Sequence, residues 1–198
     1  MTTSMRGEIM QEILILGAGF SCIDIIKSGN DAKYNIGGTA ANVVSILSQL
    51  GMKTSLLIPR YNDQYAGLFS KELQRRKVHV IEFKHSTLAT PRVIEYCDDS
   101  GKHFFETRCS ECGKYLSKVS LPSSANIQKL GNHIWQDLSV FFLDRISDGI
   151  KLGIQKARDS HAWVYYEPNC CRQFTSFYNN IAQADIVKFS EEIISQNY

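Results

Sequence analysis

Short apolar runs alternate along the chain with stretches in which apolar residues recur every three or four positions. The first run, residues 12–16 (EILIL), ends in Gly17-Ala18-Gly19, which is typical of a buried strand that enters a turn. Residues 39–50 then carry apolar side chains at helical spacing, and Gly51 follows at the position of a helix stop. We therefore expect a sheet that begins near residue 12 and a first long helix over residues 39–50.

The same rhythm continues to the end of the chain. It predicts strands at residues 54–58, 78–83, 140–143, 162–167 and 184–188, helices at residues 64–76, 146–157 and 174–181, and a further helix that begins at residue 189. Strands that alternate with helices in this way form parallel βαβ units. The pattern therefore predicts an α/β protein with a mainly parallel sheet flanked by helices.

One segment departs from this rhythm. Residues 91–97 (PRVIEYC) and 102–107 (KHFFET) are two extended runs, and the turn-forming residues 98–101 (DDSG) lie between them. These runs predict a local antiparallel flap. No internal repeat, low-complexity tract or proline-rich linker in the sequence marks a second domain.

Composition narrows the class of protein. The chain has 198 residues, 43% of them hydrophobic, and its 22 Lys and Arg nearly balance 20 Asp and Glu, for a net charge of +2. This composition excludes a disordered tail, and the near-balance of charge argues against a protein that binds nucleic acid electrostatically. No apolar stretch approaches the roughly 18 residues of a membrane span, and the first ten residues lack the apolar centre of a secretory signal. We therefore predict a cytoplasmic protein with no membrane or nucleic-acid partner.

The most informative stretch is residues 35–42 (NIGGTAAN), just ahead of the first predicted long helix. Gly37 and Gly38 let the backbone bend sharply and approach a ligand, and Asn42 falls in the first helical turn. A Gly-Gly pair before a helix is also common in loops that bind nothing. The surroundings are more specific, because Gly17-x-Gly19 and then Asp24 precede the pair.

This arrangement resembles the PfkB or ribokinase-like family of carbohydrate kinases. In that family a strand ending in a glycine turn is followed by an aspartate, here Asp24, and a Gly-Gly-x-x-x-Asn motif begins the first long helix. Further similarities are Asn62-Asp63 with Gly67, residues 167–172 (EPNCCR) and residues 184–192 (ADIVKFSEE). The resemblance implies an incomplete ribokinase-like kinase domain over residues 1–198, with β-strand lid elements around residues 28–36 and 86–118.

The resemblance also implies a sugar or nucleoside site. Its substrate-binding residues would be Asp24, Gly37, Gly38, Asn42 and Asn169. Short polar side chains suit this role, because they hydrogen-bond vicinal hydroxyls and reject analogues that lack them. The alternatives are a surface residue in a loop for Asp24 and an ordinary residue at a helix start for Asn42.

A nucleotide site is implied near the C-terminal end of the sequence. Lys188, Ser190, Glu191 and Glu192 lie where family members position ATP and the Mg²⁺ ion on its phosphates, a cation that prefers oxygen ligands. A solvated helix start explains the same residues equally well, because acidic side chains are favourable near the positive end of the helix dipole.

One departure from the family pattern is large. The Gly-Ala-Gly-Asp segment that supplies the catalytic base has no counterpart, and the only similar string is Gly17-Ala18-Gly19. We therefore expect a C-terminally truncated carbohydrate kinase with weak or absent turnover, since phosphoryl transfer needs a group that receives the hydroxyl proton. The alternatives are a non-catalytic sugar-binding or assembly protein and, less favoured, a Rossmann-type dinucleotide binder, whose third glycine is replaced by Cys22.

The cysteines raise a separate possibility. Cys109 and Cys112 have the spacing of half a zinc site, and Cys97 and His103 lie close enough in sequence to complete it. Free loop thiols are the alternative that we favour. The family resemblance also implies a homodimer through the lid, and the exposed edge of a two-stranded flap gives strand pairing between subunits a physical reason.

Overall fold

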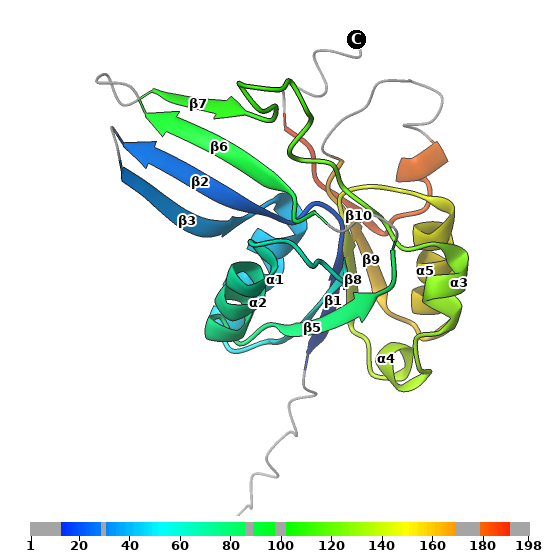
Figure 1. Ribbon diagram of the computed structural model, residues 1–198. Helices are drawn as coiled ribbons and strands as arrows, with labels where there is room; N and C mark the ends of the chain where they lie inside the picture. Colours follow the sequence, from blue (N-terminus) through cyan, green and yellow to red (C-terminus); the bar gives the residue numbers. More distant parts are fainter. Residues whose placement is uncertain (1–12, 29–30, 86–88, 98–101, 169–178, 191–198) are drawn as a thin grey trace, which may run out of the picture.

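A six-stranded sheet forms the centre of the molecule (Figure 1). The computed structural model describes residues 13–28, 31–85, 89–97, 102–168 and 179–190. The strands of the large sheet, in spatial order, are β10 (Ile186–Val187), β9 (Trp163–Tyr166), β8 (Val140–Leu143), β1 (Leu14–Ala18), β4 (Lys53–Pro59) and β5 (His79–Phe83). All neighbouring strands in this sheet are parallel. The predicted parallel sheet is thus confirmed.

A second sheet of four strands stands over one side of the first (Figure 1). We call it the lid sheet, and its strands in spatial order are β3 (Asp31–Gly37), β2 (Cys22–Ser28), β6 (Arg92–Cys97) and β7 (His103–Glu106). Strands β6 and β7 are antiparallel, as the sequence predicts. The central pair, β2 and β6, is parallel, so the predicted flap is one half of a larger sheet.

Helices cover both faces of the large sheet and form two cores. On one face lie α1 (Thr39–Gln49) and α2 (Ala66–Arg75), and on the other lie α3 (Ser124–Gln128), α4 (His133–Gln136) and α5 (Asp148–Asp159) (Figure 1). Val44 and Phe69 are completely buried in the first core, and Phe141 and Ile150 are completely buried in the second. None of the helices in the described ranges is long and apolar enough to cross a lipid bilayer.

The elements that the sequence predicts within the described residues lie within a few residues of their observed bounds, but β2, α3 and α4 are not predicted. The first helix is predicted at residues 39–50 and spans Thr39–Gln49, whereas β1 runs two residues further than predicted, through Gly17 and Ala18. The helix predicted at residues 174–181 and the one that begins at residue 189 fall mostly outside the described residues. Trp163, in the strand predicted at residues 162–167, is 59% exposed because it stands at the amino end of β9.

Three helices end in the same backbone motif. The residue two positions after the last helical residue has a left-handed conformation in each, with φ of 91° at Gly51, 58° at Lys77 and 61° at His161. The amide N–H that follows then donates to a carbonyl one turn back, as from Val78 to Leu73 at 3.0 Å. Glycine is the residue that this Schellman geometry favours, so the lysine and the histidine are exceptions.

Candidate functional site at the carboxyl edge of the sheet

The strand order creates a crevice between β1 and β8. From β1 the sheet continues through β4 and β5 on one side, and from β8 it continues through β9 and β10 on the other. Parallel α/β sheets bind ligands at such a switch point, outside the carboxyl ends of the strands. A cavity of about 420 Å³ lies there, lined by Phe20 after β1, Arg145 after β8 and Val93 of β6. We call it the carboxyl-edge cavity.

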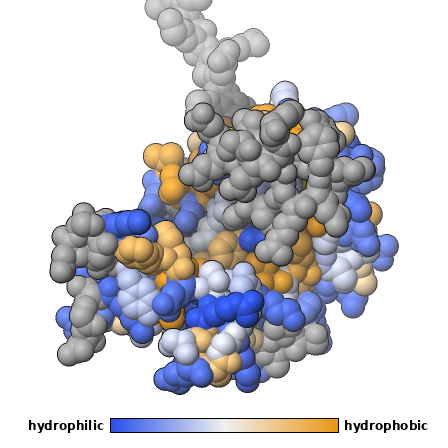
Figure 2. Space-filling model, turned by 90° about the horizontal axis from the view of Figure 1, so that it is seen from above, coloured by the Kyte–Doolittle hydropathy of each residue, from blue (hydrophilic) through white to orange (hydrophobic). Residues whose placement is uncertain are grey.

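Figure 2 looks down on this edge of the molecule. Hydrophobic residues lie in the middle of the view, and mostly hydrophilic residues surround them. Polar groups also line the carboxyl-edge cavity, among them Tyr115, Ser117 and Lys118 from the segment after β7. An apolar floor with a few polar groups around it is the usual composition of a small-molecule site.

Asp24 stands on the lid sheet next to this cavity. It lies opposite Asn35 of β3 and Val93 of β6, and Val93 lines the cavity. Its neighbours Ile23 and Ile25 point to the opposite face of the strand and are buried in the core against α1 and α2. Because side chains alternate between the two faces of a strand, Asp24 lies on the face away from that core. Asp24 is a strand residue and not the loop residue of the alternative interpretation.

The carboxyl group of Asp24 is held by its surroundings. The buried thiol of Cys22 donates a hydrogen bond to Oδ1 at 3.2 Å. Gly37 passes so close that a Cβ atom there would overlap all three atoms of the carboxyl group. Burial raises the pKa of Asp24, the hydrogen bond from Cys22 lowers this pKa, and the nearby Glu95 raises it again. Burial also keeps Cys22 protonated by raising its pKa.

Gly38 connects the lid sheet to α1 at the point where the backbone needs glycine. Its φ is 87°, in the left-handed region, and a Cβ there would lie 2.5 Å from the carbonyl oxygen of Phe20. The same carbonyl accepts a hydrogen bond from the N–H of Ala40 at 3.0 Å, which ties the first turn of α1 to the segment after β1. The structure therefore brings Asp24, Gly37 and Gly38 together beside Phe20.

Asn42 lies in the first turn of α1, as the sequence predicts. Its backbone N–H donates to the carbonyl of Gly38 at 2.9 Å, and its side chain is exposed. The neighbours Ala40 and Ala41 are completely buried, so they fix the side of the helix that faces the core. Asn42 therefore lies on the solvent side of the helix start.

Two charged residues directly after β8, Asp144 and Arg145, were not predicted from the sequence. Asp144 is 2% exposed, and its Oδ1 accepts a hydrogen bond from the N–H of Phe20 at 2.9 Å. The Arg145 guanidinium stacks over the Phe20 ring, 5.2 Å from its centroid, and its Nε lies 4.0 Å from Asp144 Oδ1. The signal that could have found them is their place directly after a buried apolar strand, where α/β proteins carry site residues.

Asp63 ties the lid sheet to the large sheet. Its Oδ2 accepts from the N–H of Thr90 at 2.9 Å, and its Oδ1 accepts from the hydroxyl of Thr90 at 2.6 Å. Thr90 is completely buried just before β6. The Asn62-Asp63 motif of the sequence therefore holds the chain where it enters the lid sheet.

The residues predicted to bind nucleotide lie further along the same edge. Lys188, after β10, donates to Glu167, after β9, at 2.8 Å, and this contact raises the pKa of Lys188. Strand β10 stands three strand spacings, about 14 Å, from β1. Ser190 is exposed. Asn169, Glu191 and Glu192 lie outside the described residues.

The zinc site predicted at Cys109 and Cys112 finds no support. Within the described part of the chain, no three His, Cys, Asp or Glu side chains lie close enough to hold a metal ion. His103, the proposed third ligand, instead pairs with Glu95 through its Nδ1. The pKa of Cys109 is lowered, mainly by hydrogen bonds from the backbone of Cys112 and of Glu111. Within the described residues, the structure thus brings no further metal ligand to Cys109 and Cys112.

Comparison with known proteins places the fold. No protein-family model and no curated protein sequence matches the chain. Fructokinase from Xylella fastidiosa matches with a TM-score of 0.69 at 16% identity, over 95% of this chain and 62% of the fructokinase chain. Fructokinase from Vibrio cholerae O395, in its fructose, ADP and calcium ion bound form, matches with a TM-score of 0.67 at 15% identity, over 94% and 63%. Adenosine kinase from Sinorhizobium meliloti matches with a TM-score of 0.67 at 14% identity, over 89% and 64%.

These matches establish the fold and its extent. The chain spans 62% of the length of the Xylella fastidiosa fructokinase, another structure of which holds bound ATP. The mainly parallel sheet with helices on both faces agrees with the fold class expected from the family resemblance. The chain therefore has the ribokinase-like fold, which sugar and nucleoside kinases share.

Proposed function

We propose that the chain is the substrate-binding part of an ATP-dependent carbohydrate kinase of the PfkB type, which phosphorylates a hydroxyl of a sugar, a nucleoside or a sugar derivative. The observation that carries the proposal is the placement of Asp24. Its carboxyl group is fixed between Cys22 and Gly37, on the lid sheet, beside the cavity at the switch point. A carboxylate held in this way can accept two hydrogen bonds from vicinal hydroxyls.

Gly38 and Asn42 complete the proposed sugar site. The left-handed conformation of Gly38 brings the backbone to the first turn of α1, where Asn42 offers an amide to a hydroxyl. Phe20 and Val93 line the adjacent cavity and give an apolar surface to a sugar face. Asn169 follows the carboxyl end of β9 in sequence, and we include it among the substrate-binding residues on the family resemblance.

The proposed nucleotide site lies on the β9 and β10 side of the same edge. Lys188 carries the positive charge that a phosphate needs, and Ser190, with Glu191 and Glu192 after it in sequence, offers the oxygen ligands that suit Mg²⁺. When bound, Mg²⁺ would neutralise phosphate charge. Family resemblance and the ATP and ADP named for the two fructokinases support this assignment.

The proposed reaction lacks one component in this sequence. Gly17-Ala18-Gly19 is followed by Phe20, so no Gly-Ala-Gly-Asp segment supplies a carboxylate to receive the hydroxyl proton. We therefore propose that the chain binds sugar but turns it over weakly or not at all. The alternative, a non-catalytic sugar-binding protein with this fold, would bind sugar equally well. It would show no turnover even if a Gly-Ala-Gly-Asp segment were added to it.

Calorimetric titration with a panel of sugars and nucleosides tests the proposal. We expect one class of compound to bind the wild-type chain, and Asp24→Asn to weaken that binding at least tenfold. Asp31→Asn is the matched control, because Asp31 also belongs to the lid sheet but is exposed at the start of β3. An ADP-release assay with ATP and Mg²⁺ then measures turnover. Equal binding by wild type and Asp24→Asn would refute the site.

We also propose that the chain forms a homodimer through the lid sheet. Three large apolar side chains of this sheet are exposed: Tyr34 by 43%, Phe104 by 45% and Phe105 by 65%. Strands β3 and β7 are its unpaired edges within the described residues. Light scattering on the wild type and on Phe105→Ser measures the oligomeric state of each. A monomeric wild type at high concentration would refute the dimer.

A further inference from the structure

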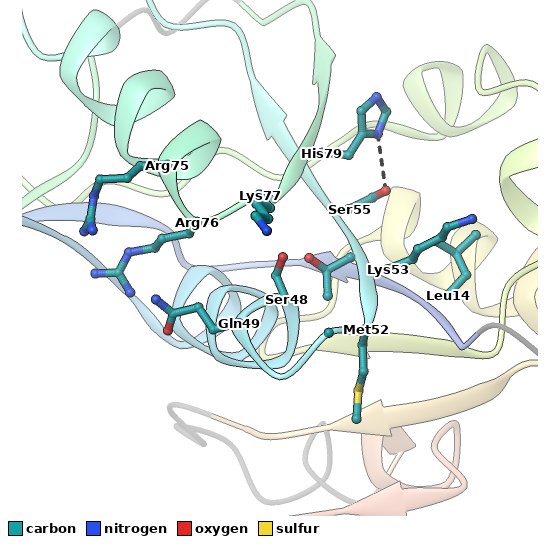
Figure 3. A pocket seen from close by; sticks show the side chains of 12 residues that line it. Leu14, Ser48, Gln49, Met52, Lys53, Ser55, Arg75, Arg76, Lys77 and His79 are labelled. Carbon is teal, nitrogen blue, oxygen red and sulfur yellow. Dashed lines mark hydrogen bonds between the residues drawn. The ribbon is translucent and has the colours of Figure 1, made fainter.

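A second and larger cavity lies at the opposite, amino edge of the large sheet (Figure 3). Its volume is about 810 Å³, and it opens between the ends of α1 and α2 and the beginnings of β4 and β5. We call it the amino-edge cavity. The proposed kinase site uses none of its residues.

The amino-edge cavity is strongly basic. Lys53, Arg75, Arg76 and Lys77 line it together with His79, and none of the described residues that line it is acidic. The net charge of the whole chain, +2, conceals this cluster, because acidic residues balance it elsewhere. Arg75 has a partner outside the lining, Glu72, whose carboxylate lies 2.9 Å from its guanidinium. Arg76 and Lys77 have no ion pair among the described residues.

Buried polar groups in the lining need a ligand atom or water. Thr54 is 4% exposed, and its hydroxyl has no hydrogen-bond partner within the described residues. The same is true of the buried Nε of Arg76. A buried donor without a partner is costly, so an acceptor atom that reaches either group would be stabilised there. In Figure 3, Ser48 lies in the middle of the view near Lys77, and Ser55 bonds to His79 at 3.3 Å.

Lys77 occupies a position that local backbone chemistry does not favour. It ends α2 in a left-handed conformation with φ of 58°, where the equivalent residue at the end of α1 is Gly51. A side chain in this conformation is strained, and glycine relieves the strain. Residues that break a local rule are expected at functional sites, and Lys77 lines the amino-edge cavity.

We propose that the amino-edge cavity binds the phosphate group of a small phosphorylated molecule. Cationic side chains and hydroxyl donors together satisfy the charge and the acceptor oxygens of a phosphate, and Arg76 and Thr54 each have a donor without a partner. The volume of about 810 Å³ is that of a site for a whole small molecule and exceeds what a bare phosphate needs. The ligand is therefore a phosphorylated sugar or a nucleotide, and phosphate is the part that is recognised.

Calorimetric titration of the full chain with pyrophosphate at low salt tests the proposal. We expect saturable binding that weakens at least fivefold in Thr54→Val, which removes the hydroxyl and keeps the shape, and in Lys77→Gly. Lys71→Gln is the matched control, because Lys71 is an exposed cation of α2 outside the cavity. Its loss changes the net charge equally and should leave the affinity within twofold of wild type.

A thermal unfolding measurement separates binding from folding. Lys77→Gly should raise the melting temperature while it weakens pyrophosphate binding, because the left-handed strain that glycine relieves is larger than the entropy that it adds to the unfolded chain. His161→Gly relieves the equivalent strain at the end of α5, outside the amino-edge cavity, and should raise the melting temperature with unchanged affinity.

Three results of these measurements would overturn the proposal. If Lys77→Gly only stabilises the fold and binds pyrophosphate as the wild type does, the cations merely complement the carboxyl ends of the helices and the proposal is wrong. Loss of affinity in Lys71→Gln equal to that in Lys77→Gly would also overturn it, as would binding of single-stranded RNA without saturable binding of pyrophosphate. Titration with a sugar phosphate and with AMP then identifies the carrier of the phosphate. Asp24→Asn should leave all of these affinities unchanged, which separates this site from the proposed kinase site.

Discussion

Gly37→Ala is the sharpest single test of the proposed sugar site. A methyl group at Gly37 would overlap the three carboxyl atoms of Asp24, so the carboxylate has to shift by roughly 1 Å or rotate away. The backbone of Gly37 is not in the left-handed region, so alanine fits the strand itself. The substitution therefore displaces the proposed contact group and leaves the fold nearly unchanged.

The displacement of the carboxylate should cost sugar affinity by the loss of at least one hydrogen bond. A hydrogen bond to a charged carboxylate contributes about 1.5–3 kcal/mol, so losing one weakens sugar binding about 10- to 150-fold. Folding stability should change by less than about 1 kcal/mol, because alanine also lowers the entropy of the unfolded chain. Gly38→Ala should behave differently, since its positive φ and the nearby carbonyl of Phe20 make it destabilising by about 1–3 kcal/mol.

Titration with the best ligand of the panel, together with urea unfolding, gives both numbers. Gly67→Ala is the control, because a Cβ at this exposed helix position meets nothing within 4 Å. It should bind normally and be as stable as wild type or more stable. If Gly37→Ala binds the sugar as tightly as wild type does, Asp24 does not contact the substrate and the proposed site is wrong.

Three further predictions concern the same framework. In titrations across pH, sugar affinity should fall as the pH decreases through the raised pKa of Asp24. Cys22→Ala should move that fall to higher pH, because the thiol hydrogen bond lowers this pKa. If the affinity does not change with pH, Asp24 does not contact the sugar. Asp63→Ala should lower the free energy of unfolding in urea by about 3 kcal/mol, because it leaves the buried N–H and hydroxyl of Thr90 without acceptors. A loss below about 1 kcal/mol would mean that water replaces the carboxylate as acceptor. Phe141→Ala should cost about 3–5 kcal/mol in the same assay, since its completely buried ring packs edge-on against Trp135, and a smaller loss would show that the core refills the cavity.

The sequence predicts most of the large sheet because its strands are apolar runs between helices of regular period. Strand β2 is not predicted, because Ile25 and Ile26 are consecutive in the sequence and break the apolar–polar alternation that identifies a half-buried strand. The pairing of β2 with β6 is also invisible, since the two strands are separated by more than 60 residues of chain.

The candidate site was predictable only in part for the same reason. Asp24, Gly37 and Gly38 follow from a motif, but their contact depends on the antiparallel register of β2 and β3. Arg145 lines the cavity and Asp144 accepts from the N–H of Phe20, but both lie more than 100 residues from Phe20 in the sequence, and no local pattern joins them to it. The amino-edge cavity likewise forms only when the ends of two helices and the beginnings of two strands meet.

The proposed sugar site and the stability of the lid sheet depend on the same pairing of strands. Ile23 and Ile25 bury their side chains against α1 and α2, and this burial fixes which face of β2 carries Asp24. A slip of one residue between β2 and β3 would place a carboxylate in the core and expose two isoleucines, which is prohibitively costly. The apolar residues that hold the lid sheet in place therefore also determine the orientation of Asp24. Substitutions of Ile23 that loosen the core are expected to weaken sugar binding without touching the ligand.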